Sequence, residues 1–179
     1  GELAQVVGSH TTDGKALGTE INISGGTIGI SGKGRDIWGN IYGGGNGILT
    51  HPEAGLIKTN TMVNISQAEG KTTTIYHNIY GGGAYGSVGT FTYDANNVIT
   101  AHTANTGTAN VTITGGTIGI NGHENGMVFG SSRGDVGAPG EIHDRLAWVY
   151  DTHVTIGNTS GGPEIRGSIY GSGENGHTY

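Results

Sequence analysis

Acidic residues beside glycines are the first side chains with evident chemistry, because calcium is bound by carboxylate, amide and carbonyl oxygens. The candidates are Asp135, Glu141, Asp144, Asp151 and the turns Glu124-Asn125-Gly126 and Glu174-Asn175-Gly176. Neither an EF-hand loop nor a glycine-aspartate calcium repeat is present in the sequence. Turn chemistry accounts for most of these residues, so no cofactor is predicted and calcium stays an open alternative.

A second group of residues has the chemistry of a transition-metal or acid–base site. His143, Asp144, Asp151 and His153 would converge if a hairpin brought them together, and such a site also needs orienting partners. The chain holds eight histidines, so coincidence explains their nearness in sequence. It has no cysteine, which excludes thiolate sites and disulfides. No catalytic or metal-binding residue is therefore predicted.

A short motif with a central aromatic residue recurs four times and has the chemistry of a sugar platform. Its copies span residues 40–45, 78–83, 127–132 and 168–173, and each runs into glycines or serines. The aromatic residues are Tyr42, Tyr80, Phe129 and Tyr170, and we expect them to form a ladder along one wall. Facing outward, this ladder would bind sugar rings; facing inward, it is core. Asn40 and Asn78, which open two copies, are expected to satisfy backbone groups of turns.

An enzyme that cleaves polysaccharide is the alternative to a binding or structural protein. Glycoside hydrolysis needs two carboxylates roughly 5–10 Å apart. The 14 acidic residues are spread through turns, and Arg133, Arg145 and Arg166 stand alone in the sequence. A fold by itself does not establish an activity. The question of enzymatic activity is left open, and a non-enzymatic role is favoured.

The composition indicates a folded all-β chain, whose strands and turns would position the residues discussed above. Glycine supplies 38 of the 179 residues, and only 12% are charged. The tyrosines and the regularly placed Ile, Val and Thr argue against disorder, and the glycines do not follow the collagen period. The net charge of −6 and the scattered basic residues predict no nucleic-acid partner. No run of 18 apolar residues occurs, so no transmembrane segment is expected.

A second recurring motif, an alternating strand followed by a turn, sets the organisation of the chain. Its copies are residues 20–29, 62–66, 110–119 and 153–157, and their equivalent isoleucines are 42, 48 and 43 residues apart. Stacking such units in register buries faces that one unit cannot bury alone. We therefore predict one domain over 1–179, a parallel β-helix or β-solenoid with units at about 19–59, 60–107, 108–151 and 152–179. Whether a unit makes one coil or two stays open.

The variable connections between motifs are predicted to form hairpins on one side of this solenoid. One pairs residues 89–93 with 97–100, another 141–143 with 146–150, and a third 48–50 with 56–58. The glycine clusters mark corners where backbones approach closely. A phosphate-binding loop would need a following helix, and no helical period of useful length appears.

These repeats, typified by Ile-Ser-Gly-Gly-Thr-Ile-Gly and Asn-Ile-Tyr-Gly-Gly-Gly, resemble the β-solenoid domains of secreted or surface proteins of bacteria, including adhesins. The resemblance implies an extracellular or cell-surface location and an adhesive or fibre-like role. It carries over no functional residue. With no evident caps on the terminal rungs, we expect a segment of a longer or polymerising protein, whose partners are further rungs of the same chain or other subunits. Polysaccharide is a subordinate alternative partner.

Overall fold

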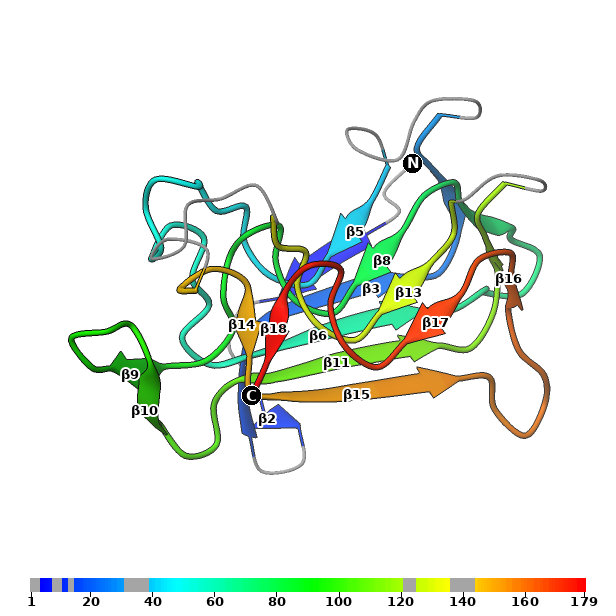
Figure 1. Cartoon of the computed structure of the whole chain (residues 1–179). Helices are drawn as coiled ribbons and strands as arrows, with labels where there is room; N and C mark the ends of the chain where they lie inside the picture. The colour runs from blue at the N-terminus through cyan, green and yellow to red at the C-terminus, as the bar shows by residue number, and fades with distance from the viewer. Residues whose placement is uncertain (1–3, 8–10, 13–14, 31–38, 121–124, 136–143) are drawn as a thin grey trace.

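The computed structural model describes residues 4–7, 11–12, 15–30, 39–120, 125–135 and 144–179. All the regular elements in these ranges are β-strands (Figure 1), so the all-β prediction is confirmed for the described part of the chain. Most of the strands lie in parallel sheets, in which neighbouring strands come from successive units of the repeat.

The alternating motifs form the first of these sheets. β3 (Lys15–Ile23), β6 (Asn60–Ile65), β11 (Thr108–Ile113) and β15 (Asp151–Ile156) lie side by side in this order and are parallel. Ile23 pairs with Ile65, Ile65 with Ile113, and Ile113 with Ile156. The register predicted from the repeat is therefore confirmed.

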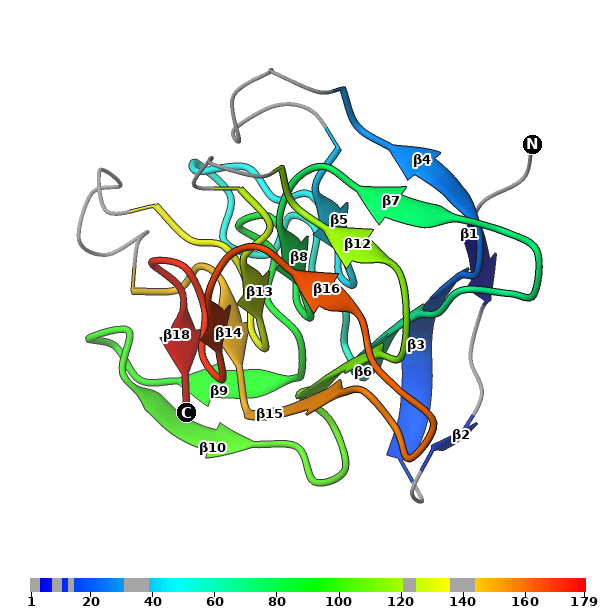
Figure 2. The same cartoon turned by 90° about the vertical axis from the view of Figure 1, so that its right-hand side faces the viewer.

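Two further parallel sheets repeat the same order (Figure 2). One contains β4 (Gly26–Ile28), β7 (Thr73–Ile75), β12 (Thr117–Ile118) and β16 (Glu164–Ile165). The other contains the aromatic motifs as β5 (Ile41–Tyr42), β8 (Ile79–Tyr80), β13 (Val128–Phe129) and β17 (Ile169–Tyr170). Each unit thus adds one strand to each of the three sheets. The turn expected after the alternating strand is in fact followed at once by a strand of the second sheet.

The core lies between the inner faces of the three sheets. In β6 and β11 the aliphatic residues of the alternating pattern are buried, and Val63, Ile113 and, on β8, Ile79 are fully enclosed. Ile75 and Ile118 of the second sheet join the same cluster. Because each strand contributes only one or two inward side chains, burial depends on stacking of the units rather than on any one unit.

Side-chain hydrogen bonds to the backbone hold the corners between sheets. Thr61 Oγ1 donates to the carbonyl of Gly81 at 2.6 Å, and Thr152 Oγ1 donates to that of Gly171 at 2.6 Å. Asn78 Oδ1 accepts from the amides of Gly126 and Met127, in the next unit. Asn40 Oδ1 likewise accepts from the Asn78 amide at 3.0 Å. The structural role expected for the two asparagines is confirmed.

The connections after the aromatic motifs differ in part from the three predicted hairpins. β9 (Phe91–Tyr93) and β10 (Ile99–His102) are antiparallel, which confirms the hairpin of the second unit. The hairpin over residues 48–58 is wrong, because Ile57 bridges in parallel to Val88 of the next unit. In the third unit, residues 141–143 lie outside the described part. The second half of that predicted hairpin contains β14 (Trp148–Val149), which pairs in parallel with β18 (His177–Thr178) of the next unit.

The two outer edges of the first sheet differ. On the amino-terminal side, β1 (Ala4–Val7) runs antiparallel along β3, and β2 (Thr11–Thr12) also pairs with β3. β1 therefore covers the outer edge of β3, although the sequence shows no evident cap there. On the other side, β15, β16 and β17 pair with one neighbour each among the described strands. We call the outer side of these three strands the open edge.

Candidate functional site

The four aromatic residues of the repeated motif stack face to face and form the predicted ring ladder. Ring centroids of Tyr42 and Tyr80 are 4.8 Å apart, those of Tyr80 and Phe129 are 5.0 Å apart, and those of Phe129 and Tyr170 are 4.9 Å apart. The planes lie within 9° of parallel. Parallel in-register strands impose this stacking, because equivalent side chains then lie one strand spacing apart.

The ring ladder is mostly enclosed. Tyr80 and Phe129 are buried, Tyr42 is half-buried, and Tyr170 is 45% exposed because it lies on the open edge. The faces of the two inner rings are covered by their neighbours, so a sugar ring has access to the outer face of Tyr170. Ligand binding along this ladder remains a prediction.

A polar cluster holds the hydroxyl ends of the ring ladder. The Tyr80 hydroxyl donates to Glu174, whose carboxylate lies 3.7 Å from Arg133 Nε. Burial raises the pKa of Tyr80 well above that of a free phenol, and the bond to Glu174 raises it further. Burial also raises the pKa of Tyr42, against the opposing effect of the nearby Arg133. These contacts tie three units together and leave the Glu174 carboxylate engaged.

Those candidates for metal or acid–base chemistry that the structure describes do not gather into one site. Asp151 Oδ2 lies 3.2 Å from His153 Nε2 on β15, and both side chains are substantially exposed. His143, Glu141 and Glu124 lie outside the described residues. Across the described ranges, no three His, Asp or Glu side chains are close enough together to hold a metal ion.

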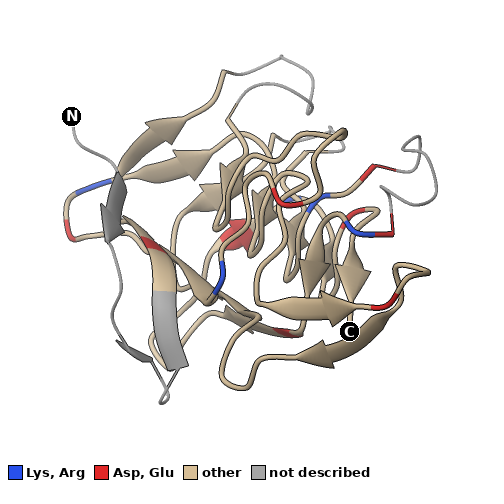
Figure 3. Cartoon of the chain, turned by 90° about the vertical axis from the view of Figure 1, so that its left-hand side faces the viewer, with Lys and Arg blue, Asp and Glu red and all other residues tan. Residues whose placement is uncertain are grey.

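The three arginines that stand alone in the sequence are paired in space, so the expectation that they are isolated is wrong. Arg133 faces Glu174, and Arg166 Nε donates to Glu164 Oε1 at 2.9 Å. That hydrogen bond lowers the pKa of Glu164. Figure 3 shows that the few basic and acidic positions are spread over the fold, some of them side by side. The Arg133 to Glu174 contact joins neighbouring units, whereas Arg166 and Glu164 are only two residues apart in the chain.

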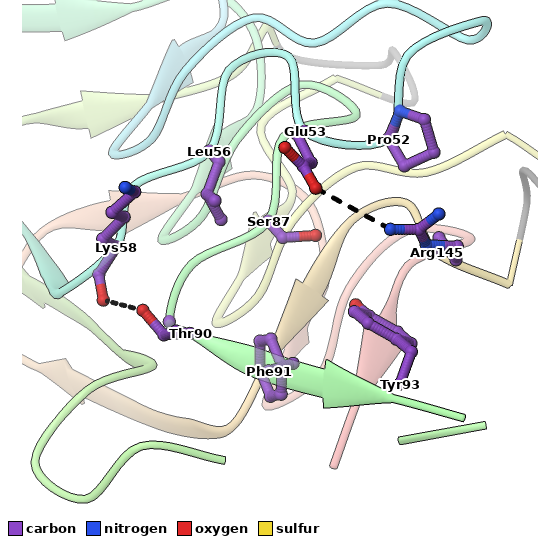
Figure 4. Close-up of a pocket in the computed structure, with 10 residues that line it drawn as sticks. Pro52, Glu53, Leu56, Lys58, Ser87, Thr90, Phe91, Tyr93 and Arg145 are labelled. Carbon is purple, nitrogen blue, oxygen red and sulfur yellow. Dashed lines mark hydrogen bonds and ion pairs between the residues drawn. The ribbon is translucent and has the colours of Figure 1, made fainter. Parts of the chain in front are cut away.

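A cleft of about 250 Å³ opens beside the β9–β10 hairpin, where the variable connections of three units meet (Figure 4). Its walls include Glu53, Lys58, Ser87, Phe91, Tyr93 and Arg145. Phe91 and Tyr93 alternate with exposed Thr92 on β9, so both rings face the cleft side of the strand. We refer to this feature as the hairpin cleft.

Arg145 is the main charged group of the hairpin cleft. Its guanidinium carbon lies 5.0 Å from the centre of the Tyr93 ring, and Nη2 lies 3.9 Å from Glu53 Oε1. Nε is closed off from solvent and has no hydrogen-bond partner. Burial raises the pKa of Tyr93, and the nearby Arg145 charge opposes that rise. No sequence motif marks this site, because its residues come from three separate connections.

A second aromatic cluster, also missed from the sequence, adjoins the hairpin cleft. The Trp148 and His177 rings stack at 4.5 Å, as the parallel pairing of β14 with β18 requires. The His102 and Tyr150 rings stack at 3.5 Å. Phe91 lies 6.2 Å from Trp148 and so links this cluster to the cleft wall. The unequal spacing of these residues along the chain hid the pattern.

Comparison with protein-family models, with curated protein sequences and with solved structures gives no match. The resemblance to bacterial surface β-solenoids therefore remains a prediction that rests on the repeats. In the described part of the chain, no helix has the length and apolar character needed to cross a membrane.

Proposed function

We propose that the chain is a β-solenoid segment of a secreted or cell-surface, fibre-like bacterial protein, with a structural or adhesive role. The support is the pattern of one strand per unit in each of three sheets, which fits one coil for each unit. In this arrangement the chain extends by adding rungs, and the variable connections project on one side as a recognition surface.

The observation that carries this proposal is the exposure of core positions on the open edge. Ile169 is 48% exposed and Ile156 is 38% exposed, whereas Ile79 and Ile113, at the same positions of inner units, are fully buried. Unpaired strand edges with apolar side chains favour addition of further strands. A further rung of the same kind, from a neighbouring chain or subunit, would cover these side chains as the inner rungs cover theirs.

A glycine at the open edge gives a sharp test of rung addition. At Gly43, Gly81 and Gly130, an added Cβ would collide with the backbone carbonyl of the next rung. At Gly171, the equivalent position, it would meet nothing within 4 Å. Gly171→Ala should therefore leave the single chain intact but prevent another rung from packing against it.

Sedimentation velocity over a range of protein concentrations measures the proposed association. We expect the wild-type chain to associate with rising concentration, and Gly171→Ala and Ile169→Lys to stay monomeric. Val98→Lys is the matched control, because Val98 is 58% exposed on the β9–β10 hairpin, away from the open edge. A wild-type chain that is monomeric throughout, or association that survives Gly171→Ala, would refute stacking at this edge.

A polysaccharide-binding β-helix is the second candidate, and the hairpin cleft is the observation that favours it. Hydrolysis needs a pair of carboxylates, and among the described residues lining the cleft Glu53 supplies one. Binding therefore has more support than turnover. A polysaccharide panel assayed for retention and for release of reducing or unsaturated ends separates the two.

A further inference from the structure

The hairpin cleft combines an aromatic wall with groups that bind polar ligands. Phe91 and Tyr93 supply flat apolar surface from one strand, and Figure 4 shows Ser87 between Glu53 and Phe91. Ser87 is only 3% exposed, and its Oγ accepts from the Trp148 amide at 3.0 Å. Among the described residues the Ser87 hydroxyl has no hydrogen-bond acceptor, so its proton is available to a ligand. Apolar surface with a few fixed polar groups is the usual composition of a small-molecule site.

Arg145 adds a cation whose hydrogen-bonding capacity is underused. The guanidinium lies over the Tyr93 ring, and Nε, which is closed off from solvent, has no hydrogen-bond partner, so a ligand would meet the terminal nitrogens. Glu53 lies 3.9 Å away, beyond hydrogen-bonding distance, and its side chain is 83% exposed. A guanidinium binds a carboxylate best through two parallel hydrogen bonds. Glu53 makes no such contact here, so a ligand carboxylate would compete with it at a small cost.

The size and charge of the hairpin cleft restrict the ligand further. Its volume of about 250 Å³ is below the roughly 300–1,000 Å³ typical of sites for drug-sized molecules, which suits a single ring. Lys58 and Arg145 give the walls two cations against the one carboxylate of Glu53, in a chain of net charge −6. The size and charge of the cleft therefore favour a small, anionic ligand.

We propose that the hairpin cleft binds one carboxylate-bearing sugar unit, such as a uronic acid, with its carboxylate on Arg145. The sugar ring packs against Phe91 and Tyr93, and a ring hydroxyl accepts from Ser87. This inference deepens the adhesive part of the proposed function. It is separate from stacking, since the cleft lies on the hairpin side and not on the open edge.

Calorimetric titration of the full chain with sodium D-glucuronate, D-glucose and sodium acetate tests the ligand class. Glucuronate should bind at least about tenfold more tightly than either of the other probes, because only glucuronate offers both the carboxylate and the hydroxylated ring. Equal binding of acetate would reduce the cleft to a plain anion site. Equal or tighter binding of glucose, or no glucuronate binding at millimolar concentration, would also overturn the proposal.

Substitutions on the two sides of the Arg145 to Glu53 contact should act in opposite directions. Arg145→Gln should weaken glucuronate binding about 10- to 100-fold, since charge-assisted hydrogen bonds are lost. Glu53→Gln should strengthen it by up to about fivefold, since an exposed competitor is removed. A loss of affinity in Glu53→Gln, or unchanged affinity in Arg145→Gln, would contradict the assignment.

Arg166→Gln is the matched control, because its side chain is 33% exposed against 31% for Arg145 and it also pairs with a glutamate. It should leave glucuronate binding unchanged, and a comparable loss would show a general charge effect. If Arg145→Gln does not fold, Arg145→Lys keeps the charge but cannot donate two parallel hydrogen bonds to a carboxylate. It should weaken binding by an intermediate factor. Sedimentation of the same variants separates failure of this site from failure of stacking.

Discussion

Tyr80 joins the packing of the ring ladder to its electrostatics. Its ring is stacked on both faces, and its hydroxyl donates to Glu174 of a unit two rungs away. The chain itself shows that a phenyl ring is tolerated in the ladder, because Phe129 occupies the next rung. Tyr80→Phe therefore removes the hydroxyl with little change in packing.

The stability difference between wild type and Tyr80→Phe should depend on pH. At neutral pH the variant should be about 1.5–3 kcal/mol less stable, because a hydrogen bond to a charged group is lost. The folded pKa of Tyr80 is raised, so its protonated hydroxyl contributes fully below the unfolded pKa of about 10. Above that pH the contribution falls by up to about 1.4 kcal/mol per pH unit.

Urea unfolding from pH 7 to pH 11 measures this difference, which should shrink above pH 10. Tyr170→Phe, in the exposed ring of the same ladder, is the control and should change stability by less than about 0.5 kcal/mol at neutral pH. A constant gap between wild type and Tyr80→Phe across the range would contradict the proposed protonation effect.

His77 presents the opposite case, a polar side chain enclosed without partners. It is fully buried, and neither ring nitrogen makes a hydrogen bond. Leaving buried polar atoms unpaired costs about 1–3 kcal/mol. His77→Leu should therefore equal or exceed wild-type stability, by up to that amount, in urea unfolding. His153→Leu, on exposed β15, should lie within about 1 kcal/mol of wild type. A clear loss of stability in His77→Leu would show that the imidazole has a stabilising partner.

At the scale of elements, the glycines that follow the aromatic strands set how closely the rungs approach. A Cβ on Gly81 would meet the carbonyl of Gly130 and lie 3.0 Å from Val111 Cγ2. Neither Gly81 nor Gly171 has a positive φ, so steric room between rungs is what distinguishes them.

Gly81→Ala should therefore destabilise the single chain by about 1–3 kcal/mol, the usual cost of overpacking. Gly171→Ala should leave the single chain unchanged or raise its stability by up to about 1 kcal/mol, since alanine restricts the unfolded chain. Thermal unfolding at low protein concentration, where the chain is monomeric, measures both. Equal effects of the two substitutions would contradict the role of rung spacing.

The sequence alone was sufficient to predict the strands that lie within the two repeated motifs. Alternation at Val63 and Ile65 gave the first sheet and its register, and the recurring aromatic position gave the third. β7 and β16 were missed because neither follows the glycine pair that precedes Thr27 and Thr117. The hairpin expected over residues 48–58 failed because Ile57 instead continues a row with Val88, a pairing that local pattern cannot reveal.

The candidate site was less predictable than the fold, for a related reason. Stacking of the ring ladder followed from the repeat, but its burial depended on which residue of each aliphatic–aromatic pair faces inward, and here both Ile79 and Tyr80 are enclosed. The hairpin cleft is formed by Glu53, Tyr93 and Arg145, which belong to three different units and lie about 40 to 50 residues apart. Their nearness follows only from stacking of those units.

At the scale of the whole molecule, stability should vary along the stack. Strand pairing in the first sheet runs from unit to neighbouring unit, so an inner strand such as β11 is held by β6 and β15, whereas β15 is held by β11 alone among the described strands. In such a linear arrangement, the free energy of local opening depends on the number of neighbouring interfaces. The open edge should therefore open more often than the inner rungs. The opposite edge of the first sheet differs, because β1 pairs with β3 and covers it.

Native-state hydrogen exchange of the monomer should show this gradient directly. Amides of β15 and β17 should exchange at least about tenfold faster than those of β11 and β13, which corresponds to about 1.4 kcal/mol or more in opening free energy. Raising the concentration of the wild-type chain should slow exchange at β15 and β17, because an added rung would pair with their free backbone groups. Gly171→Ala should keep the fast exchange at every concentration. Uniform exchange across all rungs would show instead that the chain opens as one cooperative unit, with no weaker end from which a further rung could be recruited.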